Sequence, residues 1–115
     1  MTNNFEAAFD LANLMSAIST QKKILKEEFE LSTLYFCNGG TFKIDQQLIS
    51  FVTSLKILHQ TTAVIIDQNN LPIFIDNVSI FLENILHQYT FASNKFLTDY
   101  KLLQNTRKTE SILDL

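Results

Sequence analysis

The 115-residue sequence contains only two glycines and one proline. An all-β sandwich or barrel needs a turn signal about every ten residues, so this scarcity argues against both folds. It favours a few long elements, which are usually helices. Hydrophobic residues make up 46% of the chain and charged residues 18%, a balance that supports a buried core rather than disorder. The length predicts one domain, residues 1–115.

Other absences exclude whole classes of protein. Cys37 is the one cysteine, which excludes an intrachain disulfide and favours a reducing compartment. No apolar run approaches the roughly 20 residues that span a bilayer, and the first residues do not resemble a secretory signal. The net charge of −3 offers no positive field for phosphate backbones. We therefore expect a soluble, cytoplasmic protein that binds neither a membrane nor nucleic acid.

Apolar residues recur at alternating spacings of four and three over the first third of the chain. This period predicts a long helix over about residues 5–36. The apolar residues at this spacing form one stripe along the helix, here called its seam. This seam is expected to contribute four core residues: Leu11, Ile18, Leu25 and Phe29. Asn38–Gly40 follow the last periodic residue and are expected to end the helix, because glycine takes positive φ freely.

The middle of the chain is predicted to contain short strands and one short helix. Residues 41–44 alternate polar and apolar side chains, which predicts a short strand. Asp45 is a good N-cap for a helix over about residues 46–58. Two β-branched runs within residues 63–75 flank a polar Asp-Gln-Asn-Asn turn, and this pattern predicts a hairpin.

A second long helix is predicted over about residues 77–105, followed by a tail at 106–115. Its seam is expected to complete the core with four residues: Leu82, Ile85, Tyr89 and Phe96. The two long helices should then form an antiparallel pair in which Leu25 faces Tyr89. The short helix and the hairpin form a small head. The predicted fold class is mainly α with a small β element (α+β).

The second long helix is apolar around most of its circumference, which is unusual for a helix exposed to solvent. Such a surface usually marks an interface, and we expect the chain to form a homo-oligomer through a four-helix or larger bundle. The residues expected at this interface are Phe81, Leu86, Leu97 and Tyr100.

Few residues suggest chemistry. Cys37 with His59 or His87 is the one nucleophile-like combination, but a helix C-terminus would disfavour the thiolate, and a small apolar plug is the simpler interpretation. No spacing of Cys and His residues matches a metal site, and no cofactor motif occurs. The Asn38–Thr41 stretch precedes a strand rather than a helix, so it predicts a turn and not a phosphate-binding loop. The basic clusters are small: Lys22, Lys23 and Lys26, with Arg107 and Lys108.

Three stretches carry a resemblance: YFCNGGTFK at 35–43, DQNNLPI at 67–73, and the run from Tyr100 to Lys108. With them the chain resembles the small conserved proteins of unassigned role encoded by contractile-tailed phages of marine cyanobacteria. The resemblance implies a phage setting, in the virion or the host cytoplasm. It carries no functional residues over.

The sequence therefore predicts a non-enzymatic, self-associating helical protein that serves as a phage structural or assembly module. One alternative is an accessory binding module that captures a host or phage protein through the same apolar helix face. The other is a thiol enzyme that uses Cys37 as nucleophile.

Overall fold

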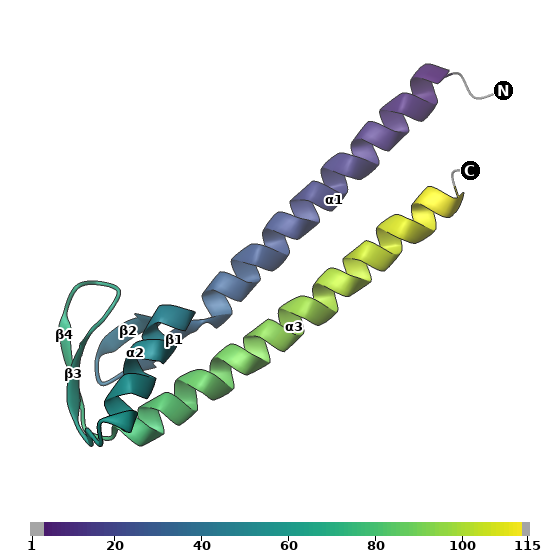
Figure 1. The fold of residues 1–115 in the computed structure, drawn as a ribbon. Helices are drawn as coiled ribbons and strands as arrows, with labels where there is room; N and C mark the ends of the chain where they lie inside the picture. The colour runs from purple at the N-terminus through teal and green to yellow at the C-terminus, as the bar shows by residue number, and fades with distance from the viewer. Residues whose placement is uncertain (1–3, 114–115) are drawn as a thin grey trace. The chain divides into compact units, whose positions relative to one another are not determined.

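The structure is a computed structural model that describes residues 4–113 (Figure 1). Within these residues, three helices predominate and the strands form two antiparallel hairpins, β1–β2 and β3–β4. The predicted class, mainly α with a small β element, is confirmed. In chain order the elements are α1 (Asn4–Ser32), β1 (Leu34–Cys37), β2 (Gly40–Lys43), α2 (Gln46–Ile57), β3 (Ala63–Ile66), β4 (Pro72–Ile75) and α3 (Val78–Leu113).

The chain divides into two compact units. Unit 1 contains residues 4–28 of α1 and residues 95–113 of α3. Unit 2 contains residues 29–94, which include the last turn of α1, both hairpins, α2 and the first half of α3. The assignment of residues 1–115 to a single domain stays a prediction.

In unit 1 the two helix segments run in opposite directions (Figure 1). Lys95 of α3 lies between two carboxylates. Its Nζ is 2.7 Å from Oδ2 of Asp99, one turn along the same helix, and 3.8 Å from Oε2 of Glu28. The Asp99 hydrogen bond raises the pKa of Lys95, and Glu28 adds to the effect. All three side chains remain accessible to water, so this cluster contributes little to stability.

The predicted seam of unit 1 is only partly buried. Ile18 is buried, and Leu25 and Phe96 are half-buried. Leu11 leaves 52% of its surface exposed, so the prediction that it lies in the core is wrong for the single chain. The helical period marks the apolar face of a helix but does not show whether another element covers it.

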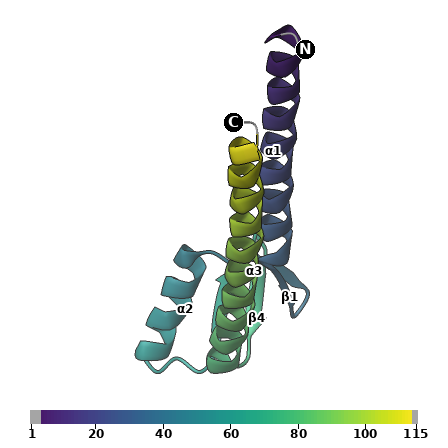
Figure 2. The same ribbon diagram turned by 90° about the vertical axis from the view of Figure 1, so that its right-hand side faces the viewer.

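The buried core lies in unit 2, where both hairpins and α2 surround the first turns of α3 (Figures 1 and 2). Its members are Phe42, Ile44, Val52, Ile65, Ile73, Ile75, Val78, Phe81, Leu82 and Ile85. Leu82 and Ile85 thus lie in this cluster, and Tyr89 packs against it. The ring of Phe29 meets that of Tyr89 edge-on at 6.1 Å between centroids. Phe29 therefore takes the place next to Tyr89 that the sequence predicted for Leu25.

The first helix ends earlier than predicted, because residues 34–37 form strand β1 rather than its last turn. Thr33 is fully buried, and its hydroxyl donates to the helix carbonyls of Phe29 and Glu30. Its own carbonyl accepts from the N–H of Ile44, at the far end of the hairpin. Through these bonds, Thr33 both ends α1 and joins it to the start of the hairpin β1–β2.

A two-residue turn joins β1 to β2. Asn38 has φ 51° and Gly39 has φ 81°, and Cys37 pairs with Gly40. Two positive φ angles between paired residues are typical of a type I′ hairpin turn. Asn38–Gly40 were expected to end a helix. In the structure, Asn38 and Gly39 instead form the turn of the hairpin β1–β2.

The remaining elements follow the sequence closely. Strand β2 begins one residue before the predicted 41–44, and α2 and the hairpin β3–β4 lie within one residue of their predicted bounds. Asp45 caps α2 as expected, since its Oδ1 accepts from the N–H of Leu48 at 2.7 Å. Helix α3 continues to Leu113 instead of ending near residue 105. The side chains of Arg107 and Lys108 lie outside the described part of the chain.

Candidate interaction surfaces

The residues that could support chemistry lie in separate places. Among the described residues, no three His, Cys, Asp or Glu side chains come close enough to hold a metal ion. Cys37 is half-buried against the core, and no hydrogen bond in the described part of the chain joins it to a histidine. His59 has φ 59° just after the end of α2, and His87 is exposed on α3 beside a shallow groove.

No helix within residues 4–113 is both long enough and apolar enough to cross a membrane. Most of the large apolar side chains that remain exposed lie on three parts of the chain: the helices of unit 1, α3 in unit 2, and the hairpin β3–β4.

The hairpin β3–β4 is apolar on both faces. Side chains alternate along each strand, and Ile65, Ile73 and Ile75 point into the core. The opposite face carries Val64, Ile66 and Phe74, each exposed at 57 or 58%. A strand with apolar residues on both faces is typical of a sheet that is covered on both sides. In the single chain, one side is open.

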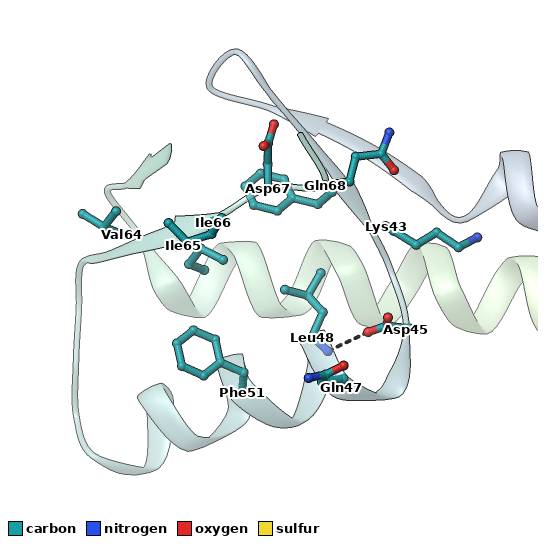
Figure 3. A pocket seen from close by; sticks show the side chains of 11 residues that line it. Lys43, Asp45, Gln47, Leu48, Phe51, Val64, Ile65, Ile66, Asp67 and Gln68 are labelled. Carbon is teal, nitrogen blue, oxygen red and sulfur yellow. Dashed lines mark hydrogen bonds between the residues drawn. The ribbon is translucent and has the colours of Figure 1, made fainter. Parts of the chain in front are cut away.

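A groove of about 400 Å³ runs between β3 and α2 (Figure 3). Leu48 and Phe51 line it from α2, and β3 lines it from the other side. Phe51 is 49% exposed, so the groove offers an aromatic side chain to whatever enters it. Charged side chains of both signs, Lys43 and Asp45 among them, lie at its rim.

Asp67 holds the turn of this hairpin. Its carboxylate accepts the N–H of Thr41 on one oxygen, and those of Asn69 and Leu71 on the other, all at 2.9–3.0 Å. The Thr41 bond is the main reason that the pKa of Asp67 lies below its ordinary value; the Leu71 and Asn69 bonds lower it further, and partial burial opposes them. Asp67 therefore acts as a structural anion that ties β2 to the β3–β4 turn.

In three of the four hairpin strands, an outward carbonyl accepts a hydrogen bond from another part of the chain. The carbonyl of Leu34 in β1 accepts from Gln88 of α3 at 2.7 Å. In β2, the carbonyl of Thr41 accepts from the N–H of Gln68, on the turn described above. In β4, the carbonyl of Phe74 accepts from the Asn38 side chain at 2.9 Å, and Pro72 has no N–H to leave open.

The outer edge of β3 is open. The N–H of Asp67 bonds to the carbonyl of Leu71, so the alternation of an antiparallel ladder turns the backbone groups of Ile65 toward β4 and those of Val64 and Ile66 away from it. Within the described residues, no hydrogen bond reaches these outward groups from another element.

The predicted interface residues on α3 separate into two groups. Phe81 is 2% exposed and meets the rings of Tyr35 and Phe42 at 5.6 and 5.1 Å, so its assignment to an interface is wrong; it is a core residue. Leu86 and Leu97 are 40% and 52% exposed, and Tyr100 is half-buried. The open edge of β3 is a further surface, which the helical periods do not indicate.

No family model, curated protein sequence or solved structure matches this chain. The resemblance to phage proteins that the sequence suggests therefore stays a prediction. Inference about function depends on the surfaces that the chain itself presents.

Proposed function

We propose that the chain is a non-enzymatic module that self-associates through the exposed apolar side chains of its long helices and serves as a structural or assembly component. One observation supports this above all. Among residues 4–28 and 95–106, Ile18 alone has a buried apolar side chain. The large apolar residues that remain exposed there are Phe5, Phe9, Leu11, Met15, Ile24, Leu97 and Leu102.

A second copy of the same helices would cover apolar side chains that water now surrounds.

The test is Leu97→Asp, measured by light scattering after size exclusion over a range of concentrations. Burying a leucine contributes about 1.5–3 kcal/mol. A two-fold interface contains the change twice, so association should weaken by about 100-fold or more. The helical content should stay unchanged, because Leu97 is 52% exposed in the single chain.

Thr106→Asp is the matched control. Thr106 is exposed and lies nine residues along α3 from Leu97, on the opposite face of the helix. The same charge there should leave the mass of the wild type unchanged. If Leu97→Asp unfolds the chain, Leu97 belongs to the core; if it leaves the mass unchanged, this helix face does not mediate association. Either result contradicts the proposal.

A phage setting, either as a virion or an assembly component, would place such an oligomer among structures built from repeated copies of one chain. That setting is part of the proposal and depends on the sequence resemblance. The competing function, capture of a different protein through the same helix face, predicts a chain that is monomeric or dimeric alone and forms a stoichiometric complex in a pull-down.

A further inference from the structure

We propose that the open edge of β3 is a second self-association site, at which two copies pair antiparallel through β3 to form one continuous four-stranded sheet, β4–β3–β3–β4. This inference deepens the proposed function, because it assigns a second interface to unit 2 while the proposed function concerns the helices of unit 1. The two interfaces involve different residues, so each can be removed without the other.

The first step is the contrast between the four strand edges. Leu34, Thr41 and Phe74 each carry an outward carbonyl that another part of unit 2 satisfies, whereas the outward groups of Val64 and Ile66 receive no such bond within the described residues. Native proteins usually protect an exposed edge with lysine, proline or a bulge. The β3 sequence Ala-Val-Ile-Ile contains no charge and no proline. The edge is thus open and unprotected.

The second step is register. Because the backbone groups of Val64 and Ile66 both point outward, a two-fold axis at Ile65 places Val64 of one copy opposite Ile66 of the other. Both residues of each pair then present an N–H and a C=O to the partner, so four inter-copy hydrogen bonds form. An axis midway between two residues would place an outward group against an inward one and would lose these bonds. The strand is therefore complementary to itself.

The third step is what lies beside the edge. An added strand would run along the groove between β3 and α2, where Leu48 and Phe51 offer apolar contacts (Figure 3). The groove is also lined by Lys43 and Asp45, so two copies related by a two-fold axis can present opposite charges to each other. On the outer face, Val64 would join Ile66 of the partner in one apolar surface.

The test removes one outward donor and leaves the hairpin intact. Val64→Pro deletes the N–H that faces away from β4, a position at which strands tolerate proline. The dimer would lose two of its four inter-copy bonds, which should raise its dissociation constant roughly 30-fold. Val64→Thr is the control, because it keeps the N–H, the β-branch and the exposed position.

Both substitutions are made in the wild type and in Leu97→Asp, and masses are measured by analytical ultracentrifugation. We expect Leu97→Asp to be a dimer, Leu97→Asp with Val64→Thr to remain one, and Leu97→Asp with Val64→Pro to be a 13.2 kDa monomer. Circular dichroism checks that each variant is folded. If Val64→Pro disturbs the fold, amide exchange of Leu97→Asp replaces it as the deciding measurement.

Amide hydrogen exchange on Leu97→Asp measures the protection of the β3 backbone without a substitution in β3. The amides of Val64 and Ile66 should be protected at high concentration and exchange quickly on dilution, while that of Ile65 stays protected by β4. A monomeric Leu97→Asp chain whose Val64 and Ile66 amides exchange quickly at every concentration would overturn the β3 proposal, and would leave the edge to a strand from another protein. That result leaves the helix proposal standing, because it is judged by the mass change that Leu97→Asp itself causes.

Discussion

Gly40 of the hairpin β1–β2 lies close to Ile73 of the hairpin β3–β4, and this contact leads to a stability prediction that can be worked out from distances. A Cβ added to Gly40 would lie 2.6 Å from Cγ1 and 2.9 Å from Cδ1 of Ile73, and 3.2 Å from the ring of Phe42. Ile73 is 8% exposed and belongs to the core cluster, so its side chain has little room to move. Gly40→Ala should therefore overpack the core and cost about 1–3 kcal/mol.

The assay is a double-substitution cycle with Ile73→Ala. That change alone should cost about 2–5 kcal/mol, because it leaves a cavity. In its background the added methyl of Gly40→Ala has space, so its cost should fall to near zero, a coupling of about 1 kcal/mol or more. The free energy of unfolding is measured by urea denaturation with circular dichroism at one fixed protein concentration, since association would shift the midpoint.

Gly39→Ala separates steric overlap from backbone strain. Gly39 has φ +81° and nothing lies within 4 Å of an added Cβ, so its substitution should cost about 1–2 kcal/mol through strain alone. That cost should be the same with and without Ile73→Ala. If Gly40→Ala also costs the same in both backgrounds, within about 0.5 kcal/mol, the close approach of the two hairpins is refuted.

Further predictions concern the core, the turn and the thiol. Ile85→Ala should cost about 2–5 kcal/mol because Ile85 is fully buried, while Ile80→Ala, at 53% exposure on the same helix, should change the free energy by about 0.5 kcal/mol or less. Because hydrogen bonds lower the pKa of Asp67 below 3.8, its contribution to stability is present above that value and is lost as the pH falls through the folded pKa. Urea midpoints of the wild type should therefore fall more between about pH 6 and about pH 3 than those of Asp67→Asn. Cys37, half-buried beside the core, should react with iodoacetamide more slowly in the folded chain than in urea; rapid labelling at neutral pH would favour the thiol enzyme instead.

The long elements were predictable because their signals are local and repeated. α2, the hairpin β3–β4 and most of both long helices lie where the apolar periods and the caps placed them. Strand β1 was not predicted, because Ser32 and Phe36 continue the four-residue spacing of the helix, and a short apolar run fits a strand equally well. Asn38-Gly39 between alternating residues is a strong hairpin signal and could have identified it. In the structure Phe36 is 72% exposed, which a continued seam would not allow.

The surfaces were less predictable, and the reason differs from one to the next. A helix that is apolar on every side does not reveal which stripe the rest of the chain covers, and so Phe81 was assigned to an interface although Tyr35 and Phe42 bury it. The open edge of β3 depends on contacts that are still more distant in sequence. Asn38 donates to the outward carbonyl of Phe74 in β4 from 36 residues away, and no residue within the described part of the chain bonds to the outward groups of Val64 and Ile66 in β3. A strand edge is open when no other segment forms hydrogen bonds with it. The sequence of one strand does not show which segments lie beside it in the fold. What the sequence does carry is the absence of a protecting charge or proline in β3, and that absence becomes informative only once the fold shows which edge is open.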